Sequence, residues 1–115
     1  MLLNHHHQLP SGVHVRLRLP VRADTERLRA LVGSDAAERL VRFDPRRRAV
    51  ICALELEEVV GVGTIELHRD ATPDLVVARD EDVKTLLEQV LVARAQTARH
   101  PPVRRGLRLR RFPRR

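Results

Sequence analysis

A strict alternation of apolar and polar side chains marks residues 13–19. The apolar positions are Val13, Val15, Leu17 and Leu19. Alternate side chains of an extended chain point to opposite sides, so this pattern predicts a half-buried strand. Pro20 ends the pattern.

Two short helices are predicted after this strand. Residues 22–32 place their apolar side chains on one helical face, and Gly33 suits the position just past a helix end. A second helix is predicted over residues 34–43, because Asp35 and Glu38 have the three-residue separation of a capping box.

The middle of the chain predicts a β-hairpin. Residues 49–54 are apolar throughout, and residues 59–67 are rich in β-branched side chains. Glu57 and Glu58 would lie at the bend. Cys52 lies within the apolar run and is predicted to be a small buried hydrophobe rather than a nucleophile, which would need exposure and a cationic neighbour.

Gly61 and Gly63 interrupt the second strand of this hairpin. Glycines within a strand mark either close packing of another element or a close approach of a ligand. We favour packing against a helix, and a ligand chain is the alternative.

The segment 74–99 predicts a strand, a tight loop and a long helix. Residues 74–78 are mostly apolar, residues 79–82 contain three carboxylates, and residues 83–99 carry one apolar stripe. The stripe consists of Val83, Leu86, Leu87, Val90, Leu91 and Ala95. His100 and the prolines that follow it end the helix.

Composition limits the chemistry. The chain has 115 residues, enough for one domain, with no Trp or Tyr and one Cys. The single Cys excludes an internal disulfide and a Cys-based zinc cluster, and no apolar stretch approaches a membrane span. We therefore expect a cytoplasmic protein that makes no contact with membranes.

The two ends of the chain differ from the body. Residues 1–12 lack either periodicity and predict a flexible arm. It contains His5, His6 and His7, for which no metal site is expected because adjacent side chains of an extended chain diverge. The predicted domain spans residues 13–103, and residues 104–115 form an Arg-rich strand or tail.

The net charge of +7 lies in the last fifteen residues. A compact group of guanidinium ions favours contact with nucleic acid or an acidic protein partner. The residues proposed for this contact are Arg104, Arg105, Arg108, Arg110 and Arg111. The alternative is a solvated tail without a partner.

The order of these elements resembles the first half of the GNAT superfamily of N-acetyltransferases. The resemblance lies in the strand 15–18, the helix 24–31, the strand 59–67 and the unit 75–87. It implies an α/β fold with a mixed sheet, in the order β-α-α-β-β-β-α and a further short strand, arranged in three layers and shortened at the C-terminal side. It also implies acetyl-CoA lying against the strand at 75–78 and acyl transfer to an amine.

On this resemblance the cofactor-binding residues are Leu75, Val76, Val77, Ala78, Arg79, Lys84 and Thr85. The family's loop after this strand carries spaced glycines that wrap the pyrophosphate, whereas the loop here has none. Its three carboxylates repel a pyrophosphate, and Asp80 or Asp82 can cap the helix in place of a ligand. We therefore expect acetyl-CoA binding to be impaired or lost.

Residues for acid–base chemistry are few. The family often uses a Tyr as general acid, and this chain has none. Glu66 and His68 are the candidates for removing a proton from an attacking amine, with structural or solvated roles as the alternative. No phosphate-loop, metalloprotease or nucleophile-elbow motif supports another enzyme class.

The sequence thus leaves three possibilities open. The first is weak acyl-CoA-dependent N-acyl transfer, and the second is a non-enzymatic binding or regulatory module. The third possibility is a structural or regulatory remnant that pairs its sheet edge with a second copy or a partner chain, because half a sheet leaves strand edges unpaired.

Overall fold

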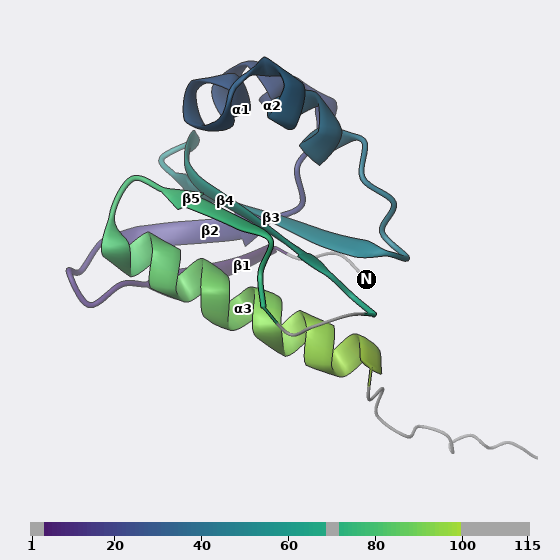
Figure 1. Cartoon of the computed structure of the whole chain (residues 1–115). Helices are drawn as coiled ribbons and strands as arrows, with labels where there is room; N and C mark the ends of the chain where they lie inside the picture. Colours follow the sequence, from purple (N-terminus) through teal and green to yellow (C-terminus); the bar gives the residue numbers. More distant parts are fainter. Residues whose placement is uncertain (1–3, 69–71, 100–115) are drawn as a thin grey trace, which may run out of the picture.

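The computed structural model describes residues 4–68 and 72–99. Helices α1 and α2 lie over one face of a sheet, and helix α3 lies over the other (Figure 1). The elements in chain order are β1 (Asn4–Gln8), β2 (His14–Arg18), the 3-10 turn η1 (Arg22–Asp24), α1 (Thr25–Val32), α2 (Ser34–Val41), β3 (Arg48–Glu55), β4 (Glu58–Glu66), β5 (Leu75–Ala78) and α3 (Glu81–Arg99). The α/β class and the three layers are therefore confirmed.

Within the described residues the sheet has the strand order β1-β2-β3-β4-β5, and each neighbouring pair is antiparallel. The expected mixed sheet is wrong for this part of the chain. Each strand follows its neighbour in sequence, and short connections or the α1–α2 pair reverse the chain between them, so antiparallel pairing results.

Two apolar clusters hold the layers together. The larger one joins α3 to the sheet through Leu87 and Leu91, which are fully buried against Ile51 and Ile65. The smaller one joins α1 and α2 to the opposite face through Leu28 and Leu40. Because β3 is covered on both faces, its six central residues are all buried, as its continuous apolar run predicted.

The predicted N-terminal arm contains a strand. Asn4–Gln8 pairs antiparallel with β2 over five residues, with His6 opposite Arg16. The prediction of no regular structure here is wrong, because the strand forms through backbone pairing with β2 and needs no apolar alternation of its own. Leu9 and Gly12 close the connection by a hydrogen bond from Gly12 N to Leu9 O.

The predicted capping box of the second helix is also wrong. Gly33 ends α1 and begins α2 with φ of 90°, a conformation open to glycine. Its carbonyl accepts the first hydrogen bond of α2, from Ala37 N, and no side chain caps the helix. Asp35 therefore lies inside the first turn, where a capping role is no longer possible.

The β3–β4 hairpin turns at Leu56 and Glu57, one residue earlier than expected. Both residues have positive φ, 50° and 70° respectively. Glu58 already belongs to β4 and pairs with Glu55. Two consecutive residues in this conformation match a two-residue turn that suits the twist of a hairpin.

Candidate functional site

The turn between β5 and α3 is the position predicted for a nucleotide cofactor. Asp80 Oδ1 accepts a hydrogen bond from Val83 N at 3.1 Å and caps the helix with its own side chain. This confirms the expected cap. A phosphate at this helix end would have to displace the carboxylate and overcome the charges of Glu81 and Asp82 in the first turn.

Arg79 is engaged by carboxylates of the protein itself. Its guanidinium forms an ion pair with Glu55 on β3 and lies 3.6 Å from Asp80 Oδ2. Lys84 and Thr85 are exposed on the first turns of α3, with their side chains outside any described hydrogen bond or ion pair. Of the predicted phosphate ligands, Arg79 is therefore already neutralised by two acidic neighbours.

The β5 residues 75–78 are half-buried and divide between the two faces. Val76 and Ala78 pack against the α3 cluster, and Leu75 packs against the cluster under α1 and α2. β5 is the last strand of the described sheet, so one of its backbone edges has no strand partner among the described residues.

Side chains of α3 occupy the space beside Gly61 and Gly63. A Cβ on Gly61 would lie 2.8 Å from Val83 Cγ1, and one on Gly63 would lie 2.6 Å from Leu91 Cδ1. Helix packing, the favoured interpretation of these glycines, is thus confirmed, because side chains of α3 occupy the space that a ligand chain would need.

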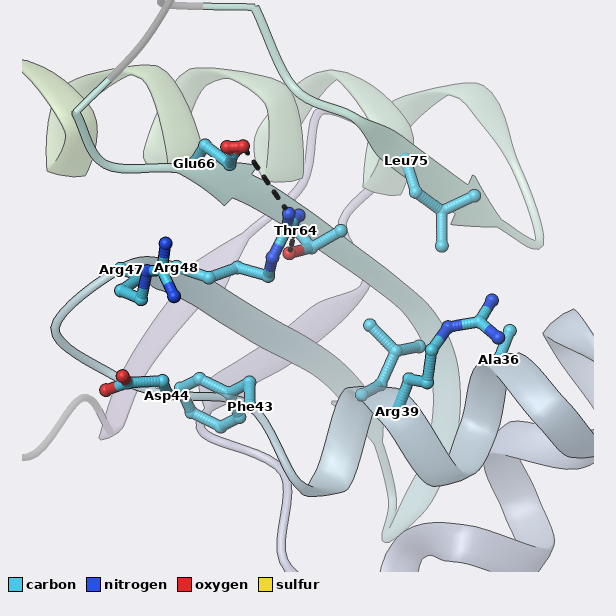
Figure 2. Close-up of a pocket in the computed structure, with 10 residues that line it drawn as sticks. Ala36, Arg39, Phe43, Asp44, Arg47, Arg48, Thr64, Glu66 and Leu75 are labelled. Carbon is cyan, nitrogen blue, oxygen red and sulfur yellow. Dashed lines mark hydrogen bonds and ion pairs between the residues drawn. The ribbon is translucent and has the colours of Figure 1, made fainter.

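The structure places a pocket of about 580 Å³ elsewhere, between α2 and the open face of β3, β4 and β5 (Figure 2). Its size is within the range typical of small-molecule and cofactor sites. It is lined by Ala36, Arg39, Leu40, Phe43, Asp44, Arg47, Arg48, Thr64, Glu66 and Leu75. The apolar members come from α2, from the residue Phe43 after it and from the start of β5.

Arg48 builds one wall of this pocket. Its guanidinium donates to Thr64 Oγ1 at 3.3 Å, pairs with Asp74 and lies 3.8 Å from Glu66 Oε1. Thr64 is buried at 5% exposure, so its hydroxyl gives the arginine a fixed anchor on β4. The positive charge of Arg48 is thereby offset by two carboxylates.

The second carboxylate lining the pocket, that of Asp44, is also engaged. It accepts hydrogen bonds from the backbone N of Arg46 at 3.0 Å and from Arg46 Nε at 3.4 Å. The hydrogen bond from the Arg46 backbone is the main cause that lowers the pKa of Asp44. The carboxylate therefore stays ionised and bound to its own loop.

Arg39 and Arg47 differ from these groups. Both guanidinium groups are exposed, and neither forms an ion pair within the described part of the chain. Figure 2 shows Arg39 on α2 and Arg47 on the loop before β3, at opposite ends of the pocket with Arg48 and Thr64 between them. The charge of Arg47 contributes to lowering the pKa of the neighbouring Asp44, and the two guanidinium groups place positive charge at both ends of an apolar floor.

The two predicted acid–base residues have separate surroundings. Glu66 lines the pocket beside Arg48, whereas His68 is exposed and its Nε2 lies 3.1 Å from the carbonyl oxygen of Arg46. A carbonyl only accepts, so Nε2 donates in this contact. Their catalytic role stays a prediction.

A buried ion pair fixes the start of the α1–α2 layer. Arg18 Nη1 lies 2.7 Å from Asp24 Oδ2, and Arg18 Nη2 lies 2.9 Å from Asp24 Oδ1. Val21 N donates to the same carboxylate at 2.7 Å. Nearby, Cys52 is buried, as predicted, and burial raises its pKa to about 12, which disfavours the thiolate form that a nucleophile needs.

Comparison of the chain with protein-family models, with curated proteins and with solved structures finds no match. The described residues of a single chain hold no group of three or more His, Cys, Asp or Glu side chains able to bind a metal ion. Among the described helices, none is sufficiently long and apolar to cross a membrane. The tail arginines Arg104, Arg105, Arg108, Arg110 and Arg111 lie outside the described residues.

Sequence reasoning missed Arg39, Phe43 and Thr64 as lining residues of the pocket. Arg47 and Arg48, which also line the pocket, were not predicted as site residues either. A signal was present in Thr64, which is the polar member of an otherwise apolar strand interior and therefore needs a hydrogen-bonding partner.

Proposed function

We propose that this protein is a non-enzymatic binding module that holds an acidic segment of a partner protein in the pocket between α2 and β3–β5. The observation that carries this proposal is the position of Arg39 and Arg47. Neither guanidinium forms an ion pair within the described residues, and the two groups flank an apolar floor formed by Leu40, Phe43 and Leu75.

The chemistry of the pocket favours a peptide over a nucleic acid. Its floor consists of aliphatic side chains and one Phe, so it suits an apolar side chain placed between two carboxylates. Base stacking needs several exposed aromatic rings, and the chain contains two Phe and no Trp or Tyr. The Arg-rich tail would add long-range attraction to an acidic partner.

The alternative function, acyl transfer from acetyl-CoA on an acetyltransferase-like fold, rests on the order of elements. Two features oppose cofactor binding at the predicted site. Asp80 caps α3 and Arg79 is paired with Glu55, so neither the start of α3 nor Arg79 is free for a phosphate. Side chains of α3 also occupy the space beside Gly61 and Gly63. We therefore place binding before catalysis.

Fluorescence anisotropy of a labelled peptide of alternating Glu and Leu tests the proposal at two salt concentrations. Arg39→Glu with Arg47→Glu is expected to weaken binding at least about tenfold, since each close charge reversal replaces attraction by repulsion. The matched control is Arg22→Glu with Arg94→Glu, which changes the net charge equally outside the pocket. Equal losses in the two variants would refute the pocket as the site.

Two further measurements separate the rival functions. Removal of residues 104–115 tests the tail, and loss of all peptide binding on this removal alone would assign the contact to the tail. Calorimetric titration of acetyl-CoA, into the natural chain and a variant with Asp80, Glu81 and Asp82 changed to Gly, tests the cofactor. Saturable binding by the natural chain would revive the acyltransferase hypothesis.

A further inference from the structure

The strand β1 carries a pair of histidines on one face. His5 and His7 are two residues apart in an extended chain, so they point to the same side of the sheet. Their ring centroids are 6.3 Å apart. They lie opposite Leu17 and Val15 on β2, which places them on the α3 side, and His6 points to the other side.

Both imidazoles remain accessible. His5 is exposed and His7 is half-buried. Neither ring forms a hydrogen bond or ion pair within the described part of the chain. Imidazole nitrogen binds Zn²⁺ at about 2.0–2.1 Å, so a change of side-chain rotamer would let both rings bind one ion. Two ligands leave a tetrahedral site half complete.

The position of β1 offers a way to complete it. β1 is the first strand of the described sheet, and its outer edge has no strand partner among the described residues. The strand Asn4–Gln8 has five residues and is centred on His6. Antiparallel pairing of this edge with the same edge of a second copy, centred on His6, would place His5 of each copy opposite His7 of the other.

Residues directly opposite in an antiparallel pair share a face and have Cβ atoms about 4.5–5.5 Å apart. The two-fold arrangement therefore gathers four imidazoles on one face. We propose that His5 and His7 from two copies form a tetrahedral site for Zn²⁺ or a similar borderline ion, and that this ion joins the β1 edges into a dimer. The partner copy supplies half of the ligands, and the proposal is independent of the peptide pocket.

Sedimentation velocity of the full-length chain, purified without any added histidine tag, tests this proposal. The metal-free chain is expected to sediment as a monomer. Zn²⁺ should convert it to a dimer, EDTA should reverse the change, and calorimetry should give one ion for two chains. His5→Gln with His7→Gln should abolish the zinc-dependent dimer.

The matched control is His6→Gln with His14→Gln, which removes the same number of imidazoles from the opposite face and should retain the zinc-dependent dimer. Circular dichroism of both variants checks that each folds. The proposal is overturned if the natural chain stays monomeric with Zn²⁺, binds one ion per monomer, or dimerises equally well in EDTA. Retention of the zinc-dependent dimer by the His5 and His7 variant would also overturn it.

Discussion

Arg18 and Asp24 form a two-bond ion pair in which the carboxylate is only 1% exposed. Burial raises the pKa of Asp24, but the hydrogen bonds from Arg18 and from Val21 N outweigh it and hold the pKa below its ordinary value. The folded state therefore favours the charged form. The pair links the end of β2 to the start of the α1–α2 layer.

We expect Asp24→Asn to lower the free energy of unfolding by about 3 kcal/mol near neutral pH, because it leaves Arg18 without its partner. A depressed folded-state pKa contributes stability above the unfolded-state value of about 3.9. The difference between the two proteins should therefore shrink as pH falls through the folded-state pKa. Urea unfolding of both proteins across this pH range measures the difference. A difference that grows as the pH falls would contradict a lowered pKa of Asp24 in the folded state.

Gly63 is expected to tolerate a methyl group poorly, because Leu91 Cδ1 occupies its position. Gly63→Ala should destabilise the fold by about 1–2 kcal/mol through overpacking. Leu91→Ala should relieve that cost, so the double variant should be more stable than the sum of the single changes by about 1 kcal/mol. Urea unfolding of the natural chain, the two single variants and the double variant completes the double-mutant cycle. Leu86 is not among the close neighbours of Gly63, so the cost of Leu86→Ala should simply add to that of Gly63→Ala, and this pair is the control.

Local pattern was sufficient to predict β2, the β3–β4 hairpin and α3. In each of these the alternation or stripe decides directly which side chains are buried, as with Val15 and Leu17 on β2 or Val83 and Leu87 on α3. The helix cap by Asp80 was also predictable, since the acceptor and donor are three residues apart.

The remaining features depend on contacts between distant segments. β1 forms because it pairs with β2, which the composition of the histidine segment does not reveal. The pocket requires Arg39 on α2 to lie across from Thr64 on β4, and only the packing of α2 on the sheet brings them together. The turn at Leu56 and Glu57 lacks the Asn-Gly signal that such turns favour.

Asp80→Ala should cost about 1 kcal/mol of stability, because Val83 N loses its acceptor at the start of α3. Glu81→Ala is the matched control. It removes one charge from the same turn and should change stability by only a few tenths of a kcal/mol. Chemical denaturation followed by circular dichroism compares the two, and equal effects would show that charge rather than capping is responsible.

The hairpin turn should gain stability from residues that accept positive φ. Leu56 and Glu57 adopt φ of 50° and 70°, and Leu56 is 91% exposed. Leu56→Asn with Glu57→Gly is expected to raise the free energy of unfolding by about 1 kcal/mol. Leu56→Ala removes the apolar side chain without the conformational benefit and should bring no such gain. A gain of equal size in both variants would point to side-chain solvation instead.

Cys52 provides a probe of opening on the α1–α2 side of the sheet. Its side chain is buried in the cluster that contains Leu28 and Leu40, and burial raises its pKa to about 12. A thiol reagent at pH 8 should therefore label the folded chain at least about 100-fold more slowly than the chain in urea, since reaction requires exposure and the thiolate.

Two variants test whether this labelling reports opening of the α1–α2 layer. Asp24→Asn weakens the attachment of the layer and should accelerate labelling. Glu26→Gln removes only an exposed ion pair with Arg29 and should leave the rate nearly unchanged. Rapid labelling of the natural chain would mean that α1 and α2 open readily, and the pocket between α2 and the sheet would then lack a fixed wall.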